Sequence, residues 1–412
     1  MSYPPISETA LNTLIKGNAY EPYYSYKSPI DLYDIHQFTN GQPFNAYDEL
    51  RENSPIYFQN PPEWDVEPGA WMLTSYKDIM EVSSNPAIYS SQAATGNLMT
   101  LGNPETRHPK LWQTSIDHML NLDGSFHLDL RREHMPFFKP GYVDELHKKV
   151  EIKVEFLLDA IAKAGQSNLV KDLSQQIPIF TLSEVLGIPE EDRHKLSTWM
   201  EFLELAQYFA AEGMKKTQGK TEEMEVDTSM IELFENMIGE MFEYGKHILQ
   251  EKRLNPKNDL LSAIANAELG GAKLSQEYLD GSWLLIIFAG NDTTRNSISG
   301  AIKLLTEFPE QKKKLLNNLD LLPNFAQETI RMVSPVIHMR RTTTCETTLG
   351  NQKLGKGEKV IMWYGAANRD PSIFSNPNLF DIERENAAKH LAFGMGRHTC
   401  IGKPVALMQL KE

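Results

Sequence analysis

The sequence is poor in cysteine: its 412 residues include only two, Cys345 and Cys400. Two thiols cannot build a disulfide framework, and the polar, proline-interrupted start does not resemble a secretory signal. A reducing, cytoplasmic setting is therefore expected. Long hydrophobic runs are also lacking, since the longest, WLLIIFAG, is far shorter than the roughly 20 residues that cross a bilayer. We expect no membrane span.

Positive charge is in deficit, with 41 lysines and arginines against 55 aspartates and glutamates and a net charge of -14. Binding to phosphate backbones requires clustered positive charge, so no nucleic-acid partner is expected. The hydrophobic fraction of 41% is sufficient for a sizeable core. Such a chain is compatible with a small neutral ligand.

The chain shows no internal repeat and no long Gly/Ser linker. Apolar residues three and four apart dominate from residue 141 to residue 253, which predicts helices. Strand patterns are few: one precedes a helix within 70–86, and two others lie near 341–344 and 359–364. We expect one large, mainly α domain with small β-sheets over 31–412, after an irregular segment at 1–30.

The longest predicted helix covers residues 276–307. Ser275 is a good N-cap, and Leu274 and Leu279 are placed as a hydrophobic staple. Before this helix, residues 200–241 are rich in methionine, which adapts to irregular shapes. That segment is either a solvated, mobile helix pair or a lid over an apolar ligand.

The surroundings of Cys400 suit a thiolate. Backbone N–H groups at a helix start stabilise a thiolate, and the residues after Cys400 predict a helix. Gly402 would let the backbone approach the sulfur, Gly394 and Gly396 would permit a tight turn, and Phe393 would shield the sulfur from water. The pattern predicts a buried, electron-rich sulfur.

Two other interpretations of these residues stay open. A buried, inert cysteine is common and explains the local pattern equally well. A zinc site built from His390, His398 and Cys400 is disfavoured, because the sequence has no Cys-x-x-Cys pair.

The stretch F393-x-x-G396-x-H398-x-C400-x-G402 resembles the haem-binding loop of the cytochrome P450 family. Three further family patterns occur in the expected order: AGNDTT at 289–294, E-x-x-R at 328–331, and the meander ANRDPSIFSNPNLFDIER that ends in Arg384. Within the family, the chain looks most like the soluble bacterial branch that includes alkane terminal hydroxylases, with terpene and steroid side-chain hydroxylases as neighbours. Relatives continue beyond the helix after Cys400, so we expect the chain to lack the usual C-terminal end.

The resemblance implies haem b (iron protoporphyrin IX), with the Cys400 thiolate as the metal ligand. It implies that the haem propionates are held by His127, Arg131, Arg341 and His398, with Arg340 as the alternative to Arg341. Arginine suits carboxylates because it donates two parallel hydrogen bonds. Further contacts with the haem are implied for Phe393, Gly402, Ala289 and Gly290.

The resemblance makes Asp292 and Thr293 the catalytic residues. Ala289 and Thr293 are one helical turn apart and share a face. Small residues at Ala289 and Gly290 would leave room for a diatomic ligand, Thr293 would hydrogen-bond O2, and Asp292 would relay protons. The alternative is a merely polar kink, since threonine also bonds back to helical carbonyls.

Glu328 and Arg331 lie three residues apart on a predicted helix. By spacing alone such a pair is a solvated surface pair of little energetic weight. The resemblance implies instead a buried structural network that Arg384 completes and that holds the thiolate loop in place.

The resemblance also places the substrate pocket. Its lining would include the loop around 96–101, the methionine-rich segment, and Leu285, Phe288, Ala289, Ile337 and Met339. These side chains are apolar and offer no charged partner, which favours a neutral, lipophilic substrate.

The expected function is therefore a monooxygenase that hydroxylates an apolar small molecule with O2. No flavin or iron–sulfur domain is fused, so electrons from NAD(P)H would arrive through a ferredoxin reductase and a ferredoxin. A peroxygenase is disfavoured because Asp292 and Thr293 are present, and a non-catalytic haem protein or inactive fragment is the alternative. A monomer is expected. The ferredoxin would dock on cations near the thiol, unless these are ordinary solvated residues: Arg132, Lys139, Arg397 and Lys403.

Overall fold

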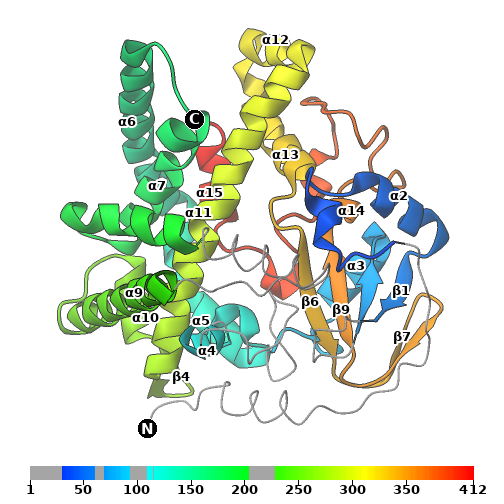
Figure 1. Cartoon of the computed structure of the whole chain (residues 1–412), viewed down its shortest axis with the longest axis horizontal. Coiled ribbons are helices and arrows are strands. Elements are labelled where there is room, and N and C mark those ends of the chain that lie inside the picture. Colours follow the sequence, from blue (N-terminus) through cyan, green and yellow to red (C-terminus); the bar gives the residue numbers. More distant parts are fainter. Residues whose placement is uncertain (1–29, 61–68, 93–108, 115, 204–227) are drawn as a thin grey trace.

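The computed structural model describes residues 30–60, 69–92, 109–114, 116–203 and 228–412. Helices gather on one side of the molecule and a β-sheet on the other, with the long helix α11 (Gln276–Glu307) running through the middle (Figure 1). The expectation of a mainly α fold with small sheets is confirmed. The loop around 96–101 and most of the methionine-rich segment lie outside the described residues.

The main sheet combines strands from the two ends of the described chain. Its order is β1 (Ile56–Gln59), β2 (Ala70–Leu73), β9 (Lys359–Trp363), β6 (His338–Thr343) and β3 (Tyr89–Ser90). The β2–β9 pair is parallel and the other neighbours are antiparallel. The predicted strand and helix within 70–86 are present as β2 and α3 (Tyr76–Ser84). Two small hairpins complete the strands: β4 (Glu268–Leu269) with β5 (Ala272–Lys273), and β7 (Thr347–Leu349) with β8 (Gln352–Leu354).

The register between β6 and β9 decides which side chains share a face. Met339 pairs with Met362, and Arg341 pairs with Val360. Because side chains alternate along a strand, Met339 and Arg341 belong to one face and Arg340 to the other. The face of Met362 and Val360 packs with Ile79 and Val82 of α3 in a single buried cluster. Arg341 is therefore directed toward the α3 side of the sheet.

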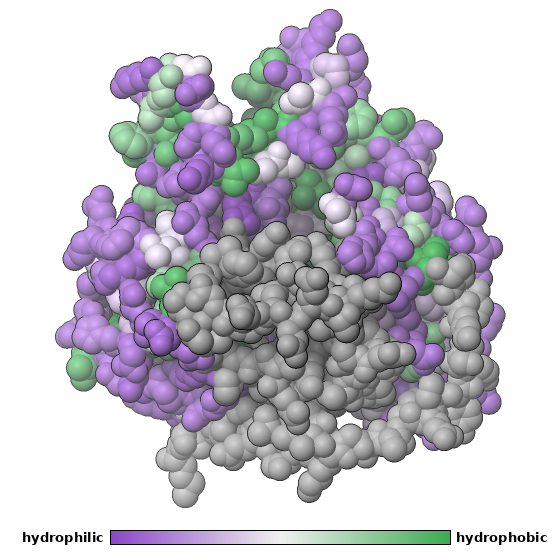
Figure 2. Space-filling model, in the orientation of Figure 1, coloured by the Kyte–Doolittle hydropathy of each residue, from purple (hydrophilic) through white to green (hydrophobic). Residues whose placement is uncertain are grey.

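The main hydrophobic core lies among the helices on the other side of the molecule. Besides α3 and α11, the described residues include the helices α2 (Phe44–Asn53), α4 (Pro109–Thr114), α5 (Gly124–His134), α6 (Pro140–Ala164), α7 (Gln176–Leu186), α9 (Thr228–Leu254), α10 (Leu260–Asn266), α12 (Pro309–Asn317), α13 (Leu322–Val333), α14 (Tyr364–Ala367) and α15 (Lys403–Gln409). The described part of the face seen in Figure 2 is largely hydrophilic. None of the described helices combines the length and hydrophobicity needed to cross a membrane.

Helix α11 begins directly after Ser275, as predicted, and Leu274 and Leu279 are both buried. The Ser275 side chain makes no capping hydrogen bond, so burial of the flanking leucines defines this helix start better than the hydroxyl does. Further along, a Cβ at Gly281 would collide with the Asp117 carbonyl oxygen. Glycine is required there because the segment after α4 touches the α11 backbone.

Two buried histidines make the stability of the fold sensitive to acid. Burial, and to a lesser extent Arg131, lowers the pKa of His134 to about 4. Burial, followed by the charges of Lys403 and Arg331, lowers the pKa of His390 to about 3. An unfolded histidine titrates at about 6.5, so the unfolded chain takes up these protons first as the pH falls.

We therefore expect full stability above pH 6.5 and a progressive loss between about pH 6.5 and pH 4. At pH 5 each of the two histidines should cost about 2 kcal/mol, measured as a lower urea midpoint. His134→Gln, which is neutral at every pH, should remove about 2 kcal/mol of the loss between pH 7.5 and pH 5, while the other histidines with lowered pKa values keep their shares. An unchanged pH slope in that variant would show that His134 does not contribute.

Candidate active site

The thiol loop is a tight turn that presents Cys400. The Cys400 N–H donates to the Phe393 carbonyl oxygen at 2.8 Å, which closes the turn. Gly394 and Gly396 have φ values of +68° and +74°, a left-handed conformation that side chains rarely adopt. At Gly396 a Cβ would also lie 2.7 Å from the Ser83 carbonyl oxygen of α3. These two glycines permit the turn, as the sequence predicted.

The Cys400 side chain is exposed, whereas a buried sulfur was expected. The protein atoms around the sulfur nevertheless shield it enough from water to raise the pKa of the thiol. The N–H groups of Gly402 and Lys403 and the charges of Arg131 and Lys403 act in the opposite direction. An open sulfur with N–H donors around it suits a metal ligand, because a metal replaces the thiol proton.

Gly402 has a smaller role than the sequence suggested. A Cβ at this position would lie 3.8 Å from the Cys400 Sγ, which is an ordinary contact, so the approach of the backbone to the sulfur does not require glycine. Phe393 is half-buried, and its ring lies 5.5 Å from the Lys403 Nζ and 5.5 Å from the His390 ring. The Phe393 ring therefore packs against Lys403 and His390.

The zinc alternative is wrong. Among the residues that the structure describes, no group of three or more His, Cys, Asp and Glu side chains is arranged to hold a metal ion. His390 is instead hydrogen-bonded to Gln327 of α13, at 3.1 Å between Nε2 and Oε1.

Helix α5 brings two predicted cations to the thiol loop. The His127 ring stacks on the His398 ring, with centroids 4.1 Å apart. Arg131 donates from Nη2 to the Thr399 carbonyl oxygen at 2.7 Å, directly beside Cys400. Burial, together with the neighbouring charges of His398 and Arg131, lowers the pKa of His127 to about 4. Two segments separated by more than 250 residues thus form one cationic cluster.

Arg341 joins this cluster, and Arg340 belongs elsewhere. Burial lowers the pKa of His398 and the charge of Arg341 adds to that effect, so the two side chains are close. Arg340 instead lies near His338. Burial, and to a lesser extent the charge of Arg340, lowers the pKa of His338 to about 4. The alternation along β6 explains the separation, and the geometry favours Arg341 over Arg340.

The residues in place fit a haem. The thiol has an open side for an iron, and the cluster beside it contains two arginines that suit two carboxylates. His127 is 1% exposed, and its Nδ1 has no hydrogen-bond partner among the described residues. A buried polar atom without a partner calls for an explanation, and a haem carboxylate would supply a partner here.

The middle of α11 contains Ala289, Asp292 and Thr293, which were predicted to bind O2 and to relay protons. Ala289 is exposed although its neighbour in the helix, Ile287, is fully buried. The Thr293 hydroxyl donates to the Ala289 carbonyl oxygen at 3.1 Å. Asp292 forms an ion pair with Arg295, one turn further along the helix. Spacing alone could have predicted the Arg295 pair, which sequence reasoning missed.

Gly290 serves a different purpose from the one expected. A Cβ there would lie 3.0 Å from a methyl group of Leu182, so the absence of a side chain lets α7 approach α11. Ala289, the other small residue of this stretch, is exposed.

The predicted pocket residues are only partly brought together. Leu285 and Phe288 are half-buried on α11, near Ala289. Met339 packs against the cluster on the α3 face of the sheet, whereas Ile337 packs against the cluster on the opposite face. Ile337 and Met339 therefore pack against different hydrophobic clusters, and their place in the substrate pocket stays a prediction.

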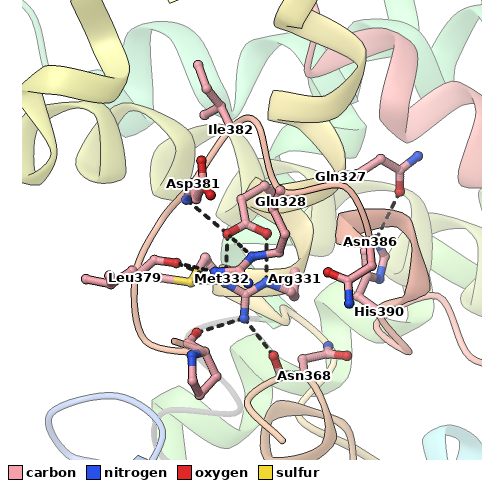
Figure 3. A network of polar contacts seen from close by, with 12 residues as sticks. Gln327, Glu328, Arg331, Met332, Asn368, Leu379, Asp381, Ile382, Asn386 and His390 are labelled. Carbon is pink, nitrogen blue, oxygen red and sulfur yellow. Dashed lines mark hydrogen bonds and ion pairs between the residues drawn. The ribbon is translucent and has the colours of Figure 1, made fainter. Parts of the chain in front are cut away.

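The predicted Glu–Arg–Arg network is buried, and Figure 3 shows the Glu328 and Arg331 side chains facing each other. Arg331 donates from Nε and Nη2 to the two carboxylate oxygens of Glu328, each at 2.7 Å. Arg384 donates from Nε to Glu328 Oε1 at 3.0 Å. The two guanidinium groups also bind backbone carbonyl oxygens of the following residues: Asn368, Ser375, Asn376, Pro377 and Leu379.

The network connects α13 to the thiol loop. The carbonyl groups bound by Arg331 and Arg384 belong to residues 368–379, and the chain then returns toward α13 (Figure 3). Asn368 accepts the Leu391 N–H on its Oδ1 at 2.6 Å, and His390 is bound by Gln327. The backbone that leads into the cysteine turn is thereby fixed to α13 at several points.

Comparison with known proteins places this geometry in a family. The family model described as "Cytochrome P450" matches residues 88–412, more than three quarters of the chain. "Linalool 8-monooxygenase" of Pseudomonas putida is 31% identical over 382 residues, covering 92% of this chain and 89% of the relative. "Steroid C26-monooxygenase" of Mycolicibacterium smegmatis is 28% identical over 93% of this chain and 86% of its own length.

The solved structures agree. A cytochrome P450 of Mycobacterium marinum, solved in complex with pseudoionone, superposes with a TM-score of 0.82 at 28% identity. The match covers 95% of this chain and 91% of that chain. The fold is thus shared along almost the whole chain.

Proposed function

The chain belongs to the cytochrome P450 family and is a monooxygenase, and we propose that it hydroxylates an apolar small molecule with electrons delivered by a ferredoxin. The observation that carries this proposal is the exposed Cys400 thiol, flanked by N–H donors and adjoining the cationic cluster of α5, β6 and the thiol loop. A thiol beside two arginines suits a haem, which needs a ligand for its iron and partners for its two carboxylates.

A haem held through Cys400 supplies the oxygen chemistry, because a thiolate pushes electron density onto the iron. His127, Arg131, Arg341 and His398 would hold its two carboxylates. The N–H groups of Gly402 and Lys403 moderate the charge on the sulfur. The Glu328 network keeps the loop that carries these groups in one conformation.

Thr293 and Asp292 would handle protons at the oxygen side of the site. The Thr293 hydroxyl is held by the Ala289 carbonyl oxygen on the exposed strip of α11. Asp292 is held by Arg295 and has a partly exposed carboxylate, so it can exchange protons with water. A helix with these groups in adjacent positions can pass a proton from solvent to a ligand beside Ala289.

We expect Thr293→Ala to bind substrate normally but to form at least roughly tenfold less product per NAD(P)H, with the missing equivalents recovered as hydrogen peroxide. Thr294→Val is the matched control, since Thr294 is buried and points to another side of α11. Its ratio of product to NAD(P)H should equal that of the unmodified protein. Equal coupling in both variants would exclude the role of Thr293.

The substrate is proposed to be a lipophilic hydrocarbon: an alkane, a fatty chain, a terpene or a steroid side chain. The residues on α11 near Ala289 are apolar, with Leu285 and Phe288 half-buried. The relatives point the same way by their names, which include a linalool monooxygenase, a steroid monooxygenase and a methyl-branched lipid ω-hydroxylase. Apolar side chains recognise such molecules by shape and by exclusion of water.

The ferredoxin is proposed to dock on cations near the thiol loop. Arg132, Lys139 and Arg397 are exposed, whereas Lys403 is half-buried with its Nζ over the Phe393 ring. Arg132 also pairs with Asp129 at 3.0 Å, which reduces its free charge. A local positive patch of this kind can attract an acidic partner despite the negative net charge.

Arg132→Glu combined with Lys139→Glu should slow electron transfer from ferredoxin by about tenfold at low salt, because surface charges act mainly on association rate. The difference should shrink as salt screens the charges. Lys303→Glu with Lys312→Glu, the same charge change on exposed residues of α11 and α12, should leave the rate unchanged. Equal rates in both double variants would place the docking surface elsewhere.

The proposed function is tested by turnover. Purified haem-loaded protein would be screened against alkanes, terpenes and steroids by the spin-state change of the haem, and the binders incubated with NADH, ferredoxin and ferredoxin reductase. A hydroxylated product supports the proposal. Product formed only with hydrogen peroxide would make the protein a peroxygenase, and binding without any product would make it a non-catalytic haem protein.

A further inference from the structure

Asp123 is an acidic residue in the middle of the cationic cluster. It lies immediately before α5 and does not cap that helix. Its Oδ2 accepts the N–H of Ser91 at 3.0 Å, the N–H of Gln92 at 3.2 Å and the Ser90 hydroxyl. Its Oδ1 lies 3.2 Å from Nε2 of His398. One carboxylate therefore joins the end of β3, the start of α5 and the thiol loop.

The contact with His398 fixes that ring. A carboxylate only accepts hydrogen bonds, so the Nε2 of His398 carries the hydrogen that Asp123 receives. The plane of the ring is set separately by stacking on His127 at 4.1 Å. The side chains of His398 and Asp123 are 7% and 17% exposed, which keeps water from competing for this bond. The orientation of His398 is thus determined by two contacts from the α5 side.

The other oxygen fixes the neighbouring chain. Three donors from consecutive residues, Ser90 to Gln92, converge on Oδ2. Burial tends to raise the pKa of Asp123, but the hydrogen bonds from His398 and Ser90 outweigh it and hold the pKa below the usual value. The group is an ionised carboxylate with charge-assisted bonds, which are about twice as strong as neutral ones.

We propose that Asp123 is a positioning residue for the haem: anchored to the end of β3 by Ser91 and Gln92, it orients His398 in the cradle for the propionates. This inference rests on the proposed function of the site. Asp123 does not touch the reacting atoms.

A purely electrostatic role predicts the opposite effect. A carboxylate near two propionates repels them, so its removal would hold the haem more tightly if charge were decisive. If positioning is decisive, its removal releases His398 and the loop, and the haem is lost faster. The sign of the change in haem release distinguishes the two.

The experiment measures transfer of ferric haem from the holoprotein to a haem-scavenging globin in excess. Asp123→Ala should release haem at least about tenfold faster, as expected for loss of a charge-assisted hydrogen bond. Asp123→Ala combined with His398→Ala should release haem no more than about twofold faster than His398→Ala alone, because Asp123 acts through His398. Ser90→Ala, which removes one donor on the β3 side, should stay within about twofold of the unmodified protein.

Each outcome is decisive. Slower release from Asp123→Ala, or effects of Asp123→Ala and His398→Ala that simply multiply, would overturn the inference. Asp123→Ala must also keep its melting temperature and the thiolate signature of its reduced carbon monoxide complex. Faster haem release that only accompanies a lower melting temperature would indicate a general loss of stability, and it would likewise overturn the inference. An unmodified protein without that signature would contradict the proposed function, whereas a normal signature with unchanged release contradicts only the role of Asp123.

Discussion

Cys400→His should abolish the absorption band that marks thiolate ligation in the reduced carbon monoxide complex, and it should reduce monooxygenase turnover to background. The Cys400 sulfur is the open group of its loop, and the N–H groups of Gly402 and Lys403 are oriented toward it. An imidazole at this position can bind iron but supplies a neutral ligand, so the electron push of a thiolate is lost. Arg131, bonded to the Thr399 carbonyl oxygen, would then lack the anion that it faces.

Cys345→Ser is the matched control, because Cys345 is the other cysteine, is also exposed and lies beyond the end of β6. That variant should keep both the band and the activity. If Cys400→His kept the band and Cys345→Ser lost it, the ligand would have been misassigned. Spectra of the two variants, recorded at equal haem content, settle the assignment without any substrate.

Arg331→Met should be the most destabilising substitution among the variants considered. It leaves the fully buried Glu328 carboxylate with Arg384 as its remaining cation, and it removes the donors for the carbonyl oxygens of Asn368 and Pro377. Breaking a buried ion pair from one side costs about 3–5 kcal/mol, a large part of the roughly 5–15 kcal/mol that stabilises a domain. Urea unfolding of the haem-loaded protein should show the loss.

Arg132→Met provides the comparison at the surface. Arg132 and Asp129 have the same three-residue spacing as Arg331 and Glu328, but their side chains are 72% and 41% exposed. That variant should change the free energy of unfolding by less than about 0.5 kcal/mol. Arg331→Lys, which keeps the charge without the planar fork, should lie between the two. Similar losses for Arg331→Met and Arg132→Met would contradict a structural role of the buried network.

The sequence predicted the regular parts of the fold well because their signals are local. Helix α11 starts after Ser275, where the leucines on both sides are buried, and the strand and helix within 70–86 follow their apolar pattern. The glycines at 394 and 396 mark a turn that their φ values require. These features depend on neighbours within a few residues.

The features that the sequence did not predict depend on contacts between distant segments. No signal in the sequence pointed to Asp123, whose carboxylate binds His398, 275 residues away. Gly290 looked like space for a ligand, yet it accommodates Leu182 of α7. Arg341 was preferred to Arg340 on the family resemblance alone, and the register of β6 against β9 supplies the physical reason.

The local sequence pattern also could not predict which side chains are buried and which are exposed. Glu328 and Arg331 have a spacing typical of surface pairs, and only the family resemblance indicated that they are buried, as they are. Cys400 was expected to be buried, and its side chain is exposed. Spacing fixes which residues share a helix face, but what covers that face is decided by the rest of the chain.

The parallel pairing of β2 with β9 sets an order of events during synthesis. Ala70 is aligned with Lys359, so the two strands emerge from a ribosome roughly 290 residues apart, which at about 5–20 residues per second is on the order of 15–60 s. Until then β2 has only β1 beside it, and a two-stranded hairpin is marginal by itself. Arg341 and Cys400 also emerge late. The nascent chain can therefore complete its central helices first, and it gains the sheet and a complete haem cradle together, once these later segments have emerged.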